Sequence, residues 1–233
     1  MVLKIKAKFD NGVFWEQYND LERQFLNFLE YVPYFDQNKE AVSFRLASLV
    51  LSIGGYVDSA FKEMARYPKF YRTTECREIR NRAKKRMSII ALCLRFFEDK
   101  YGLSKKRVIF KRLPERETVF PFAPANPRNG APAWWDAYNG LKHEFSRNFY
   151  RANLVNTRDA LAAAFLLNVR HISGAVRLSE YGFMKAEIRT PQGRVRGIAP
   201  SPDPNTVKKI LEEGNGIAGV FVETTLFIFD YMQ

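Results

Sequence analysis

The part of this sequence that decides the fold reads Ala133-Trp134-Trp135-Asp136-Ala137-Tyr138-Asn139-Gly140-Leu141-Lys142-His143-Glu144-Phe145-Ser146-Arg147-Asn148. Wound as a helix, it gathers four apolar side chains on one side, which we expect to face the core: Trp134, Tyr138, Leu141 and Phe145. The stretch therefore predicts an amphipathic helix over 134–145, with Pro132 as its first-turn proline.

A polar stripe follows another side of this predicted helix. Asn139, His143 and Arg147 are spaced four residues apart and would lie in line, with Lys142 and Trp135 at the border. His143 is one of two histidines in the chain, and imidazole titrates near neutral pH. The cations could bind a phosphate while His143 transfers a proton. Asn139, Lys142, His143 and Arg147 are thus the candidate catalytic residues; a solvated polar face is the alternative.

Further helices are predicted on both sides of this stretch. Apolar residues recur at helical spacing over 13–32, 40–66, 74–100 and 157–180. The pair Gly54-Gly55 would let a neighbouring helix approach the second of these closely. Gly102 is a plausible end for the third.

The β-signals are short by comparison. Residues 2–9 alternate and precede a turn signal at Asp10-Asn11-Gly12. Short strands are predicted at 108–110 and 118–120, where prolines exclude a long helix.

The C-terminal third is harder to interpret. A Gly/Pro-rich connection near 189–204 is expected to be irregular, and a short helix to follow at 205–213. Segment 217–231 fits a strand or a buried helix, and we favour the strand. One domain over 1–233 is expected, a mostly α helical bundle with a few short peripheral β-strands.

The charge of the chain favours acidic partners. Thirty-seven Lys and Arg against 25 Asp and Glu give a net charge of +12, so RNA or another polyanion is a candidate partner. The run 75–112 is the most basic, and its nucleic-acid-binding candidates are Arg77, Arg80, Lys84 and Lys85. A solvated helix face explains these residues equally well.

Several classes of protein are disfavoured. Cys76 and Cys93 fit no metal or redox spacing and are expected to be free, buried thiols. Ligand-type residues do not cluster, so we expect no metal and no cofactor. Charges interrupt every apolar run, so no membrane-spanning helix and a cytoplasmic location are expected. The second histidine, His171, is interpreted as structural.

The central motif also has a familiar arrangement. Trp134-Trp135-x-x-Tyr138-Asn139-x-x-Lys142-His143 is preceded by Val57-Asp58-Ser59-Ala60-Phe61-Lys62 and by Val119-Phe120-Pro121-Phe122. It is followed by Ala152-Asn153-Leu154-x-Asn156. This pattern resembles a group of uncharacterised bacterial and archaeal proteins and the wider HEPN superfamily of helical bundles, over residues 40–180.

The resemblance implies an activity. Many HEPN proteins are metal-independent endoribonucleases whose motif is Arg, a polar residue, three further residues and His. Asn139 matches the polar position and His143 the histidine, whereas Tyr138 stands at the arginine position and carries no permanent charge. Lys142 or Arg147 could compensate. Because each protomer has one such histidine, a homodimer is expected.

Two functions therefore remain open from the sequence. The first is a HEPN-like protein that binds RNA or another polyanion, with or without ribonuclease activity. The second is a non-catalytic interaction module with an unidentified protein partner.

Overall fold

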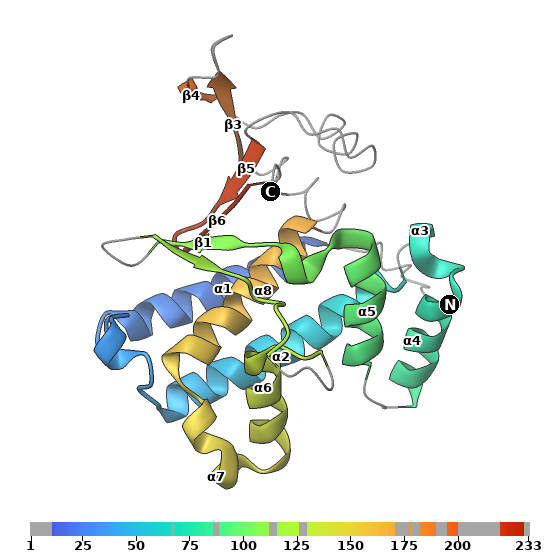
Figure 1. The fold of residues 1–233 in the computed structure, drawn as a ribbon, viewed down its shortest axis with the longest axis horizontal. Coiled ribbons are helices and arrows are strands. Elements are labelled where there is room, and N and C mark those ends of the chain that lie inside the picture. Colours follow the sequence, from blue (N-terminus) through green and yellow to red (C-terminus); the bar gives the residue numbers. More distant parts are fainter. Residues whose placement is uncertain are drawn as a thin grey trace, which may run out of the picture.

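The computed structural model describes residues 11–66, 68–85, 89–111, 116–125, 130–170, 178, 182–189, 195–199 and 220–230. These residues form a mostly helical body with one antiparallel sheet beside it (Figure 1). The predicted mostly α fold is confirmed. The strand predicted at 2–9, the helix predicted at 205–213 and His171 lie outside the described residues.

Two helices make up the centre of the body. Helix α2 (Phe44–Met64) and helix α8 (Leu154–Arg170) pack along each other, and α1 (Asn11–Leu29) and α6 (Ala133–His143) pack against both. Most side chains of α8 are buried, which its alanine-rich sequence permits because small side chains let neighbouring helices approach from several sides. The turn predicted at residues 10–12 is corrected, since Asn11 and Gly12 begin α1.

The single helix predicted over 74–100 is wrong. The chain forms α4 (Thr74–Lys84) and then α5 (Ile90–Tyr101), which pack against each other after the short α3 (Pro68–Tyr71). One straight helix would carry the apolar second half away from the core that also covers Cys76 in α4. Two helices let both segments bury their apolar sides against that core.

Two smaller predictions in this region are confirmed. Gly102 ends α5 in the left-handed conformation, with φ of 58°, and its N–H donates to the carbonyl of Glu98 at 2.7 Å. Cys76 and Cys93 are free and buried, and burial raises the pKa of both thiols.

The described strands form one six-stranded antiparallel sheet in the order β2-β1-β6-β5-β3-β4. Their bounds are β1 (Val108–Phe110), β2 (Glu117–Val119), β3 (Met184–Arg189), β4 (Val195–Ala199), β5 (Val220–Glu223) and β6 (Phe227–Asp230). Strand β6 packs on α8, while β3 and β4 extend away from the helices (Figure 1).

The predictions for these strands had mixed outcomes. The strands predicted near 108–110 and 118–120 are confirmed as β1 and β2. The C-terminal strand is a hairpin, because β5 and β6 pair around residues 224–226. The irregular connection near 189–204 is corrected: β4 lies within it, paired with β3. Its hydrogen bonds come from a distant strand, which local composition does not reveal.

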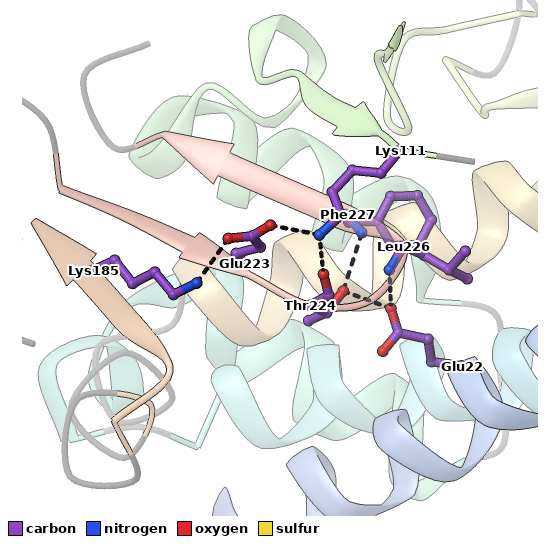
Figure 2. A network of polar contacts seen from close by, with 7 residues as sticks. All are labelled: Glu22, Lys111, Lys185, Glu223, Thr224, Leu226 and Phe227. Carbon is purple, nitrogen blue, oxygen red and sulfur yellow. Dashed lines mark hydrogen bonds and ion pairs between the residues drawn. The ribbon is translucent and has the colours of Figure 1, made fainter. Parts of the chain in front are cut away.

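A buried carboxylate joins the hairpin to α1 (Figure 2). Glu22 Oε1 accepts hydrogen bonds from Thr224 Oγ1 at 2.5 Å, from the Leu226 N–H at 3.0 Å and from the Tyr18 hydroxyl at 3.2 Å. The side chain is 6% exposed, and burial raises the pKa of Glu22 although these donors oppose the shift. Satisfied in this way, Glu22 fixes the 224–226 turn against the helical body.

A second polar group in the same view joins three strands (Figure 2). Lys111 Nζ, which follows β1, lies 2.5 Å from Glu223 Oε1 and 2.7 Å from the Thr224 carbonyl oxygen. Lys185 Nζ of β3 lies 2.9 Å from Glu223 Oε2. Hydrogen bonds from the two lysines lower the pKa of Glu223.

The packing of α6 on α2 depends on Gly54. A Cβ atom built at Gly54 would penetrate the ring of Tyr138, whereas one built at Gly55 would meet nothing within 4 Å. The close helix approach predicted from the glycine pair is thus confirmed for its first member.

This difference gives a matched pair of variants. Gly54→Ala should lower the free energy of unfolding by about 1–3 kcal/mol, because the added methyl group overpacks the Tyr138 contact. Gly55→Ala should raise it by up to about 1 kcal/mol through helix propensity. Urea unfolding followed by circular dichroism measures both; equal effects of the two variants would contradict the packing at Gly54.

The network of Figure 2 predicts a pH dependence with a definite sign. Because the folded-state pKa of Glu223 is lowered, its stabilisation is present above the unfolded pKa and is lost as the pH falls through the folded pKa. Glu223→Gln should therefore be less stable than the wild type at pH 7, and the gap should close on acidification. Thermal unfolding between pH 7 and about pH 3 measures it.

Glu22 should show the opposite sign. Its folded-state pKa is raised, so its favourable contribution is present below the unfolded pKa and is lost as the pH rises through the folded pKa. Glu22→Gln keeps a neutral oxygen acceptor, so the wild type should lose stability relative to this variant as the pH rises. A Glu22→Gln difference that runs parallel to that of Glu223→Gln would refute this account.

Candidate functional site

Several residues of the central motif are buried and pack against other parts of the core. Trp134 Nε1 donates to the Pro121 carbonyl at 2.6 Å, and the Trp134 ring meets Phe122 edge-on. Tyr138 is buried against Gly54. Trp135, predicted at the border of the polar stripe, is only 4% exposed, and that prediction is wrong. The reason is that α6 packs against both α2 and α8, which buries more than one side of it.

The second motif, Ala152 to Asn156, forms the start of α8. Asn153 Oδ1 accepts from the Asn156 N–H at 2.9 Å, and Asn153 Nδ2 donates to Glu40 Oε2 at 2.7 Å. Asn156 Nδ2 donates to the Arg151 carbonyl at 2.9 Å. The helix begins at Leu154 rather than at residue 157 as predicted, so these amides have a structural task.

Three polar residues in the last turns of α6 do not stabilise a helix end in this way. Asn139 is half-buried, while Lys142 and His143 are exposed. Lys142 Nζ lies 3.5 Å from the Tyr138 hydroxyl and 5.4 Å from the centroid of its ring. A positive charge therefore stands beside the ring and hydroxyl of Tyr138. Within the described ranges, no hydrogen bond or ion pair engages the His143 side chain.

The straight stripe Asn139–His143–Arg147 is corrected. Helix α6 ends at His143, Glu144 breaks it with φ of −138° and ψ of 67°, and α7 (Phe145–Asn148) begins a new turn. Asn148 Nδ2 holds this break by donating to the carbonyls of Gly140 at 3.2 Å and Glu144 at 3.0 Å.

Helix α7, which carries Arg147, nevertheless lies with the end of α6 on the side of the molecule away from β3 and β4 (Figure 1). Its guanidinium lies 3.5 Å from Glu144, and both side chains are largely exposed. Exposed pairs of this kind contribute little free energy, so Arg147 can exchange this partner for a phosphate.

Exposed aromatic side chains occur in α7 and at the start of α2, and the sequence did not point to them. Phe145, predicted to face the core, is 37% exposed, and Phe44 at the start of α2 is 73% exposed. The ring of Phe44 lies 4.7 Å from that of Phe149 in the 3-10 turn η3 (Phe149–Arg151). Phe145 leaves the core side because the helix break redirects the chain before it.

The basic candidates of α4 divide into two groups. Arg77, Lys84 and Lys85 are exposed. Arg80 instead donates to the carbonyls of Ala65 at 2.7 Å and Tyr71 at 2.6 Å, with its guanidinium 4.0 Å from the Tyr71 ring centroid. Arg80 therefore joins α4 to the ends of α2 and α3.

A buried charged group was missed by sequence reasoning. Arg158 of α8 lies 2.6 Å from Glu117 of β2 and donates to Asp159 at 2.7 Å, and its guanidinium faces the ring of Tyr34. Burial raises the pKa of Asp159, and Arg158 partly opposes this. The sequence feature that could have revealed this group is the Arg158-Asp159 pair inside an apolar helix. Because its charges are paired, we interpret this group as a link between sheet and helices.

Two further observations concern the part of the chain that the structure describes. No group of three His, Cys, Asp or Glu side chains there is arranged to hold a metal ion. No described helix combines the length and the apolar composition needed to cross a membrane.

Comparison with protein-family models, with curated proteins and with solved structures finds no match for this chain.

The contrast within α4 is testable. Arg80→Ala should lower the free energy of unfolding by about 1–3 kcal/mol, because it leaves two helix-end carbonyls without a charged donor. Arg77→Ala, on the exposed side of the same helix, should stay within about 0.5 kcal/mol of the wild type. Urea unfolding measures both. An Arg80→Ala variant as stable as the wild type would contradict the structural role of Arg80 and make it again a candidate for nucleic-acid binding.

Proposed function

We propose that this protein is a HEPN-like RNA-binding protein that acts through the α6–α7 end of its helical body, with His143 as the proton-transferring group for RNA cleavage. The observation that supports it most is the difference in burial between the aromatic residues of the motif and its cationic residue and histidine. Trp134, Trp135 and Tyr138 are buried, whereas Lys142 and His143 are exposed at the end of the same helix. Packing therefore accounts for the motif's aromatic residues and leaves its cation and imidazole unexplained.

The proposed chemistry needs a base, an acid and positive charge. His143 takes the proton of a ribose 2′-hydroxyl, the 2′ oxygen bonds to phosphorus, and the bond from phosphorus to the 5′ oxygen breaks. The products are a 2′,3′-cyclic phosphate and a 5′-hydroxyl, whose proton comes from the protonated His143 of a second copy in a homodimer. Lys142 and Arg147 face the phosphate oxygens and stabilise their charge.

A second candidate function is RNA or polyanion binding without cleavage. The burial of Tyr138 favours it, since no guanidinium occupies the position of the family arginine and only Lys142 stands nearby. Both candidates place the RNA on the same surface of the protein, and they differ in the role of His143 alone.

The test is incubation of the purified protein with structured and unstructured RNAs in EDTA. The wild type should produce 2′,3′-cyclic phosphate ends, and His143→Ala should lower the rate by about 100-fold or more while RNA binding persists. Lys142→Ala should weaken binding as well, because it removes a phosphate contact. Lys105→Ala, at an exposed lysine of the turn after α5, is the charge-matched control.

Each result selects one function. Cleavage that persists unchanged in His143→Ala would remove the catalytic role. Salt-sensitive binding without cleavage would leave the non-catalytic polyanion-binding protein. Neither binding nor cleavage would favour the protein-interaction module.

A further inference from the structure

An exposed aromatic surface lies next to the His143 end of α6. It consists of three rings in mutual contact, Phe44 of α2, Phe145 of α7 and Phe149 of η3, together with Tyr150, which follows Phe149 in η3; we call these four side chains the aromatic patch. Phe44 and Tyr150 are the most exposed, at 73% and 62%. The Phe44 and Phe145 rings are nearly parallel, at an interplanar angle of 13°, and Phe149 contacts both.

Water contact at this patch is unfavourable for the protein alone. Single exposed aromatic residues are ordinary, but three rings in mutual contact form a contiguous apolar surface, and such surfaces mark interaction sites. The rings are held by the helix break at Glu144 and by the start of α2, where the Ser43 hydroxyl accepts from the Leu46 N–H at 3.0 Å. The patch is thus presented on ordered backbone.

Cationic residues lie close to the aromatic patch along the chain. Arg45 follows Phe44 and is exposed. Arg151 follows Tyr150, donating to its hydroxyl at 3.0 Å with the guanidinium 5.6 Å from the ring centroid. Lys142 and Arg147 flank Phe145 in the chain, and Glu144 is the carboxylate paired with Arg147. These neighbours of the aromatic residues carry four positive charges against one negative charge.

The combination of exposed rings and cations favours some ligands of the aromatic patch over others. A second copy seated on these rings through a two-fold axis would bring together two surfaces that both carry Arg45 and Arg151, which costs electrostatic free energy. A folded duplex would offer phosphates but no free base faces. A single strand offers both phosphates for the cations and unpaired bases for the rings.

We propose that the aromatic patch is a stacking platform for unpaired bases of single-stranded RNA, with Arg45 and Arg151 on its phosphates. The inference rests on the proposed RNA-binding function and deepens it, because it specifies unpaired RNA as the substrate class. Phe44 and Tyr150 supply the exposed ring faces, and the neighbouring α6 end supplies the cleaving group.

The experiment compares two probes that differ only in their bases. A labelled 12-nucleotide oligouridylate and an abasic ribose-phosphate strand of equal length are titrated with the full chain by fluorescence anisotropy. The double variant F44A/Y150A should bind the oligouridylate about 5- to 150-fold more weakly than the wild type does, with abasic-strand binding within twofold. F44W/Y150W should keep the affinity, because tryptophan also stacks.

Two controls accompany the variants. Phe120→Ala removes a ring that is 47% exposed after β2, and it should leave both affinities unchanged. Thermal unfolding of F44A/Y150A checks that the fold persists, since both side chains are largely exposed.

The outcomes separate the two proposals. If the wild type binds neither probe, the RNA-binding function itself fails. If it binds both and F44A/Y150A leaves the oligouridylate affinity unchanged, or lowers both affinities equally, RNA binding stands and base stacking is overturned. A change in sedimentation mass in F44A/Y150A would instead identify the patch as a contact between copies and would also overturn the inference.

Discussion

The close contact between α6 and the backbone of α2 determines much of this structure. Gly54 has no side chain, so the ring of Tyr138 lies directly on α2. With Tyr138 placed there, Trp134 on the same helix reaches the Pro121 carbonyl, which fixes the loop after β2. The last turn of α6, with Lys142 and His143, then projects at the end of the body. The absence of a side chain at Gly54 thus determines where Lys142 and His143 are located.

The sheet depends on a different kind of interaction. Its hairpin meets α1 through the buried Glu22 carboxylate, and its β2 edge meets α8 through Arg158 and Glu117. Buried polar groups are costly unless they are satisfied, so each of these contacts favours one arrangement of sheet and helices over others. Apolar packing alone tolerates small sliding motions; directional hydrogen bonds to a turn N–H do not.

The aromatic residues of the central motif have a different role from its cations and His143. Aromatic side chains in it fill space in the core, as Trp134 does, whereas the amide that completes a helix end, Asn153, belongs to the second motif. Cationic side chains and His143 remain on the surface, next to rings that are also exposed. A surface that combines cations with aromatic rings suits a ligand with alternating charge and planar groups, and single-stranded RNA has both. The proposals on function and on substrate class both follow from this separation.

The sequence by itself determined what depends on neighbouring residues. Helical spacing predicted α2 and α6, the end of α5 at Gly102 followed from backbone freedom, and Gly54-Gly55 indicated a close helix contact. Tertiary structure alone decided the division of residues 74–100 into two helices, the pairing of β4 with β3, the burial of Trp135 and the exposure of Phe145. It also moved Arg147 out of line with Asn139 and His143. The physical reason is that periodicity describes one element in isolation, whereas the breaks, strand partners and second buried faces of these elements are set by residues distant in the chain.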